Sequence, residues 1–204
     1  RVRGGAGRRR RRAVAPRCAA STFRDIDNPY TGDVSQYEVL DEAQTRERLA
    51  LADAAQRAWR RVSVAERVDA MRAFMQAFTA EPFREAVARD ITAQMGKPIS
   101  QARGEVDGMV GRCEALMALA PTVLGDEHLP PLDGGAIERT IAREPVGIVL
   151  CIAPWNYPLL TTVNAVAAAV LAGNAVLLKH SSRTPAVAPH FEAAFRAAGV
   201  PDGV

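Results

Sequence analysis

Lysine is almost absent from this chain of 204 residues: Lys97 and Lys179 are the only two, against 24 arginines. Cysteine and histidine are also scarce, with three of each. They are Cys18, Cys113 and Cys151, and His128, His180 and His190. Their wide spacings match neither a zinc-ligand pattern nor a disulfide framework. The sequence therefore predicts no metal site, and a reducing compartment fits it.

The chain also lacks a long unbroken hydrophobic run. Residues 145–178 come nearest to one, but several prolines and asparagines interrupt them. A membrane-spanning helix needs about 20 consecutive apolar residues. With 48% hydrophobic residues overall, the sequence predicts a globular core and no membrane partner.

Acidic residues are missing from positions 1–20, which hold eight arginines. The rest of the chain carries 18 basic and 23 acidic residues, a net charge of −5, so the formal charge of +3 comes from this basic tail. An acidic body argues against nucleic acid as a partner. The tail suits a transit peptide, which favours a mitochondrion or plastid over the cytoplasm. An RNA-binding arm and a translated upstream region are the other interpretations.

Two capping boxes predict where the first helices begin. Asp41 is followed three residues later by Gln44, and Ser63 is followed by Glu66 at the same spacing. In such a box each side chain accepts a hydrogen bond from the other residue's backbone N–H, which satisfies two free donors at the helix start. We therefore expect helices after Asp41 and after Ser63.

The next elements are predicted from proline and glycine. A third helix is expected over residues 82–95, ending at Gly96 in a left-handed conformation. A fourth is expected over 100–119, and the glycines within it suggest close packing against another element. Residues 130–144 are then expected to form a hairpin or an extended excursion, with an Asp-Gly-Gly turn.

From Pro145 onward the pattern changes to alternating strands and helices. Residues 146–153 and 174–179 are short apolar runs, and 158–172 is an apolar helix that ends at a glycine. A further helix is expected from Thr184 at its cap. Strand, helix, strand and helix in this order predict an α/β fold with Rossmann-like parallel βαβ units. Because the strands are apolar throughout, both faces of the sheet are expected to be covered.

The stretch "IVLCIAPWNYPLLTTVNA" interrupts this apolar half with prolines, a tryptophan and an amide. Ligands of open parallel sheets bind beyond the carboxyl ends of the strands, which is where PWNYP falls. Asn156 there is either an N–H donor to an oxyanion or a cap of the following helix. Lys179 ends the next strand and either binds a phosphate or sugar hydroxyl or extends into solvent.

Neither strand end carries a G-x-G-x-x-G or Walker lysine motif, so a standard phosphate loop is absent. Cys151 lies inside an apolar strand, where a thiol without a basic neighbour is inert. We interpret Cys151 and Cys113 as core residues.

These motifs together resemble the aldehyde dehydrogenase superfamily over about residues 26–204, in its N-terminal portion. The resemblance is carried by the order and spacing of several segments, and among the branches the semialdehyde dehydrogenases are the most similar. The segments are "NPYTGDV", "QMGKPISQARGEV", "REPVGIVLCIAPWNYPLL", "AAAVLAGNAVLLKHSSRTP" and "AAGVPDGV".

The resemblance implies roles for seven residues. Asn156 is expected to hold the aldehyde oxygen, and Lys179 to bind the adenosine ribose. Ser182 stands where NAD-preferring members often carry a glutamate that repels a 2′-phosphate, so NADP or dual use with NAD is expected. The nicotinamide side of the groove is expected to be lined by Ile152, Ala153, Pro154 and Trp155.

The resemblance also implies a covalent mechanism and a division of the chain. A cysteine thiolate attacks the aldehyde and a glutamate activates water, and both are expected downstream of this chain. Residues 21–125 and 145–204 are expected to be part of a cofactor-binding domain. Residues 126–144 are expected to belong to an arm that joins subunits into a homo-oligomer. The alternative is a non-catalytic family member that binds nucleotide or pairs with full-length subunits.

Overall fold

The computed structural model describes residues 22–135 and 137–204, and it begins with an antiparallel hairpin of β1 (Thr22–Asp27) and β2 (Val34–Val39). The basic tail over residues 1–20, which includes Cys18, lies outside the described residues.

The predicted helices of the first half are confirmed, and both capping boxes form. These helices are α1 (Glu42–Trp59), α2 (Val64–Thr79), α3 (Phe83–Met95) and α4 (Ile99–Val123). Asp41 and Ser63 each accept a hydrogen bond from the backbone of the residue three positions on, and the reciprocal bonds are present. Gly96 ends α3 with a φ of 76°. Helix α4 is longer than expected and contains Pro121 in its last turn.

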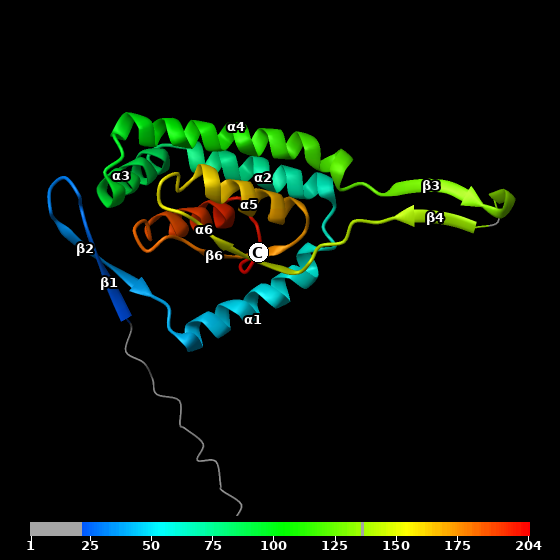
Figure 1. Ribbon diagram of the computed structural model, residues 1–204, viewed down its shortest axis with the longest axis horizontal. Coiled ribbons are helices and arrows are strands. Elements are labelled where there is room, and N and C mark those ends of the chain that lie inside the picture. The colour runs from blue at the N-terminus through cyan, green and yellow to red at the C-terminus, as the bar shows by residue number, and fades with distance from the viewer. Residues whose placement is uncertain (1–21, 136) are drawn as a thin grey trace, which may run out of the picture.

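The excursion after α4 is a second antiparallel hairpin. Strands β3 (Glu127–Leu132) and β4 (Ile137–Ile141) are joined through the short helical turn η1 (Asp133–Gly135). Figure 1 shows this hairpin extending away from the helical body, at the end opposite to β1 and β2. The predicted hairpin is therefore confirmed.

The second half folds as the predicted parallel unit. Strand β5 (Ile148–Ile152) pairs in parallel with β6 (Ala175–Lys179), and α5 (Leu160–Leu171) connects them. Helix α6 (Val187–Ala197) follows. The backbone N–H of Val176 donates to the carbonyl of Val204 at 2.9 Å, so the last residue lies beside β6 as a further strand would.

One hydrophobic core joins α2, α3, α4, α5 and α6, and it reaches β5 through Cys151. Aromatic rings of α2 and α6 stack within it: the centroids of Phe74 and Phe195 are 4.1 Å apart. The sheet lies between these helices and α1 in Figure 1. This core holds the two parallel strands, and therefore their carboxyl ends, in a fixed relation.

Three expectations about packing need correction. Helix α1 packs on β6, but Leu150 and Ile152 of β5 remain 61% and 68% exposed, so one sheet face is only partly covered. Of the glycines in α4, Gly108 packs closely, against Leu160, whereas Gly104 and Gly111 have open space around them. Helix α6 begins at Val187 with Ala186 at its cap, two residues beyond the predicted cap Thr184, whose hydroxyl bonds His180.

Candidate functional site

The carboxyl ends of β5 and β6 meet directly. Ile152 is the register partner of Lys179, and the next backbone N–H, that of Ala153, donates to the Lys179 carbonyl at 3.1 Å. The PWNYP segment leaves the sheet from this bond. The structure thus brings together the two strand ends that the sequence marked as the site.

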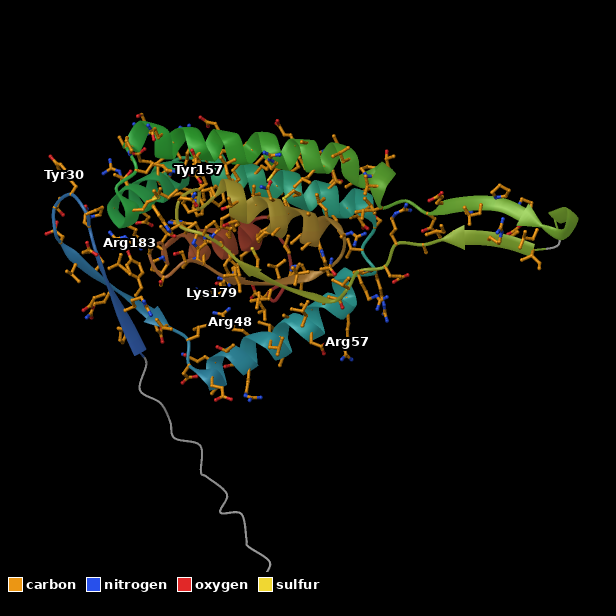
Figure 2. The ribbon with its side chains drawn as sticks, in the orientation of Figure 1. Tyr30, Arg48, Arg57, Tyr157, Lys179 and Arg183 are labelled. Carbon is orange, nitrogen blue, oxygen red and sulfur yellow. The ribbon has the colours of Figure 1, made fainter. Side chains whose placement is uncertain are left out.

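Most of the predicted cofactor-contacting residues are accessible. Trp155 is 52% exposed, and Pro154, Lys179 and Ser182 are also exposed. Ala153 is buried, so it contributes its backbone to this edge and not a side-chain surface. Figure 2 shows Tyr157, Lys179 and Arg183 at the end of the body opposite to the β3–β4 hairpin.

Asn156 is exposed and does not cap α5. The cap position is Leu159, and no side chain of this local segment bonds the helix start. Instead, the carboxylate of Glu105 in α4 accepts from the N–H groups of Leu159 at 2.8 Å and Leu160 at 3.2 Å. Because Glu105, and not Asn156, accepts from the free N–H groups at the start of α5, the capping interpretation of Asn156 is wrong. Its amide remains available to a ligand.

The same carboxylate forms a buried ion pair with Lys97, which the sequence did not single out for the site. Lys97 Nζ contacts Glu105, donates to the Asn156 carbonyl at 3.0 Å, and lies 4.4 Å from the centroid of the Tyr157 ring. One signal was visible beforehand: Lys97 is one of only two lysines in the chain.

Arg183 is a second residue that the sequence did not assign to the site. It lies directly after Ser182 and, with Met95 and Trp155, lines an open hollow of about 310 Å³. Its guanidinium also binds Asp27 of β1, through the carboxylate and the backbone carbonyl. This bond lowers the pKa of Asp27. Arg183 therefore connects the β1–β2 hairpin to the loop after β6.

His180 joins the two strand-end loops from the buried side. Its Nε2 lies 3.1 Å from the Pro158 carbonyl, which can only accept, so Nε2 carries the proton. Nδ1 then accepts from the Thr184 hydroxyl at 3.1 Å. Burial lowers the pKa of His180 to about 4, and the charge of Lys179 acts in the same direction. The histidine is neutral at pH 7.

This low pKa predicts a loss of stability in mild acid. Unfolded His180 takes up a proton near pH 6.5, but the folded residue does so only near pH 4, so the unfolded state binds more protons between these values. The free energy of unfolding is expected to fall by about 2 kcal/mol from pH 7 to pH 5 on account of this residue. Denaturant titrations at both pH values measure the fall.

The variant His180→Asn is expected to lose most of that pH dependence. His128→Asn is the matched control, because His128 lies on the exposed β3–β4 hairpin and bonds only Thr140 within the described chain. An unchanged pH dependence in His180→Asn would contradict the assignment.

The cysteines of the described chain are buried, as expected. Burial raises the pKa of the Cys151 thiol, and burial together with the nearby Glu114 raises that of Cys113 to about 12. A nucleophile must be a thiolate at working pH. Neither residue can serve as one, which agrees with their interpretation as core residues.

Within residues 22–135 and 137–204, no group of three or more His, Cys, Asp or Glu side chains is placed to hold a metal ion. In the same ranges, no helix has both the length and the apolar character that a membrane crossing requires.

An exposed amide, an exposed ammonium group and an aromatic side chain lie together at the carboxyl ends of adjacent parallel strands, the edge at which α/β proteins of this architecture bind their ligands. Comparison with known proteins identifies the family of α/β proteins to which the chain belongs. The chain belongs to the aldehyde dehydrogenase family, whose model matches residues 17–204.

The curated relatives include semialdehyde dehydrogenases. The chain is 34% identical over 180 residues to malonate-semialdehyde dehydrogenase 2 of Shouchella clausii, covering 88% of this chain and 36% of the relative. It is 35% identical over 177 residues to succinate-semialdehyde dehydrogenase [NADP(+)] of Deinococcus radiodurans, covering 86% and 36%. The chain therefore spans a little over a third of the length of these relatives.

The fold is shared with solved structures of the family. One from Sinorhizobium meliloti 1021, described as a methylmalonate-semialdehyde dehydrogenase complexed with NAD, superposes with a TM-score of 0.83 at 28% identity. The match covers 93% of this chain and 38% of that one. The resemblance to the N-terminal portion of this family is confirmed.

Proposed function

We propose that this chain supplies the first part of an NAD(P)-dependent dehydrogenase that oxidises an aldehyde to a carboxylic acid. The observation that carries the proposal is the exposed, uncommitted amide of Asn156 next to the paired strand ends that bear Lys179. Family membership and the semialdehyde dehydrogenase relatives support it. A semialdehyde is the substrate class that these relatives suggest.

The residues at the strand ends fit a dinucleotide. Ile152 and Trp155 offer an exposed apolar and aromatic surface for a ring, and Lys179 offers an ammonium group that makes no ion pair within the described residues. NAD(P), when bound, would accept the hydride that leaves the substrate. The protein residues orient this cofactor: Ile152, Pro154 and Trp155 would support the nicotinamide side, and Lys179 would donate to ribose hydroxyls.

Asn156 would act on the substrate oxygen. When a thiolate adds to an aldehyde, the carbonyl oxygen becomes an oxyanion, and a fixed N–H donor stabilises that charge more than the neutral carbonyl. Of the cysteines in the described residues, neither Cys113 nor Cys151 supplies the thiolate, since both are buried and protonated. We propose that the cysteine that supplies it and the water-activating glutamate follow this part of the chain.

Ser182 bears on the choice between NAD and NADP. It is an exposed residue three positions after Lys179, and a hydroxyl there does not repel a phosphate as a carboxylate does. One relative carries NADP(+) in its name. We propose NADP use, with NAD as a second cofactor.

Calorimetric titration of the chain with NADP and with NAD tests nucleotide binding. Lys179→Ala is expected to raise the Kd of both at least tenfold, because it removes a charged hydrogen-bond donor. Arg57→Ala is the control, since Arg57 is an exposed cation on α1 that pairs with Asp53. Ser182→Glu is expected to weaken NADP binding more than NAD binding. An unchanged Kd in Lys179→Ala would contradict the proposed site.

A second candidate is a non-catalytic subunit that pairs with full-length copies. The β3–β4 hairpin that projects in Figure 1 offers a surface for such pairing, because Leu132, Ile137 and Ile141 are between 45% and 48% exposed on it. We propose that this hairpin is the family's oligomerisation arm in either case. Reading the mature transcript beyond Val204 separates the two: a confirmed stop codon there supports the non-catalytic subunit.

A further inference from the structure

A buried ion pair lies beneath the PWNYP segment. The side chains of Lys97 and Glu105 are only 8% and 2% exposed, whereas the other ion pairs of the described residues have at least one well-exposed partner. Taking two charges out of water costs several kcal/mol per ion, and replacing such a pair by hydrophobic residues is often neutral or stabilising. Stability alone is therefore a weak reason for this pair.

The remaining hydrogen bonds of the pair go to the segment that contains Asn156. Lys97 donates to the backbone carbonyl of Asn156, and its ammonium group lies over the Tyr157 ring. Glu105 accepts from Leu159 and Leu160. The pair thus holds the chain at Asn156 itself and again at the start of α5.

This way of satisfying a helix start differs from the starts of α1 and α2, and the outside acceptor at the start of α6, Gln94, is uncharged. Helices α1 and α2 are capped by the adjacent residues Asp41 and Ser63, which bury no charge. A local Ser or Asp at position 158 or 159 could serve α5 without burying a charge. Only a partner from outside the segment fixes its position relative to α4, and so relative to the rest of the site.

We propose that Lys97 and Glu105 are positioning residues that hold the Asn156 amide in the geometry required to bind the oxyanion. The proposal rests on the proposed function of Asn156. Lys97 fixes the backbone from which the amide projects, and Glu105 prevents the following helix turn from shifting. Catalysis is sensitive to such placement, because an oxyanion donor must lie within hydrogen-bond distance of the developing charge.

The decisive variant is Lys97→Met/Glu105→Leu, which removes both charges and retains an apolar core. It is expected to fold, and amide exchange at Leu159 and Leu160 is expected to accelerate at least tenfold. In the enzyme encoded by the complete reading frame, kcat is expected to fall at least tenfold while the NADP Kd stays within twofold. Asp107→Asn is the matched control, because Asp107 lies on the same helix as Glu105 but pairs with Arg84 of α3 and not with the PWNYP segment.

Two further variants separate positioning from general stability and from the role of Asn156. Adding Asn156→Ala to the double variant should lower kcat no further than Asn156→Ala alone, because both changes remove the same interaction. If the leucine variant fails to fold, Lys97→Met/Glu105→Gln replaces it: the amide oxygen keeps an acceptor for Leu159, so exchange protection should return while kcat stays low.

The outcomes are distinguishable. A folded double variant with normal kcat, in an enzyme that Asn156→Ala impairs, would overturn the positioning role alone. Normal activity in Asn156→Ala would instead overturn the proposed function, and with it the catalytic purpose of the pair. Unchanged exchange at Leu159 and Leu160 would show that Glu105 does not hold the helix start.

Discussion

Asn156→Ala is expected to lower kcat for aldehyde oxidation by about 10²–10³-fold, the usual effect of removing one oxyanion donor. The change should fall mainly on kcat and kcat/KM, since the bond matters most when the oxygen carries charge. Steady-state formation of reduced nucleotide by the enzyme of the complete reading frame measures it. The variant should fold normally, because the Asn156 side chain is exposed.

Asn164→Ala is the matched control for this experiment. It makes the same amide-to-methyl change at an exposed position on α5, eight residues after Asn156. Its kcat should remain within twofold of the unaltered enzyme. Equal losses in both variants, or full activity in Asn156→Ala, would contradict the oxyanion role.

Helix starts with a local cap could be predicted from this sequence, whereas those satisfied by a residue far along the chain could not. The starts of α1 and α2 were predicted, because Asp41 and Ser63 bond backbone groups three residues away and the sequence shows both partners. The start of α6 was misplaced. Thr184 was taken as a local cap, but its hydroxyl bonds His180, and Gln94 of α3 accepts instead from the N–H of Ala186.

The start of α5 shows the same limit inside the candidate site. Glu105 lies 54 residues before Leu159, and no sequence rule of local spacing connects them. The positions of Asn156 and Lys179 were predicted, since each directly follows or ends a recognisable apolar strand. What holds Asn156 was not, because Lys97 and Glu105 act through tertiary contacts.

Exposure could also not be taken from hydrophobicity. Leu150 and Ile152 are as apolar as the buried residues around them, and the sequence predicted covered faces. An apolar strand indicates that something covers it in the working protein, but not which residues do so. Ile152 and Trp155 are exposed in the same way. Under the proposed function, a bound cofactor and further protein would cover them.

Gly173→Ala is expected to lower the free energy of unfolding by about 2–4 kcal/mol. Gly173 follows α5 with a φ of 85°, which costs a residue with a Cβ about 1 kcal/mol. The added Cβ would also lie 1.9 Å from Nη1 of Arg67, so this buried side chain would have to shift. Such overpacking typically costs a further 1–3 kcal/mol. Denaturant unfolding measures the loss.

Gly199→Ala isolates the steric part of this effect. Gly199 ends α6 with a φ of 75° and the same pair of backbone bonds, but a Cβ there would meet nothing within 4 Å. It should cost only about 1 kcal/mol. Adding Arg67→Met to Gly173→Ala should restore stability to the level of Gly199→Ala, since Nε and Nη1 of Arg67 bond no described residue. Equal losses from both glycine substitutions would show that Arg67 moves aside and that its contact does not restrict the turn between α5 and β6.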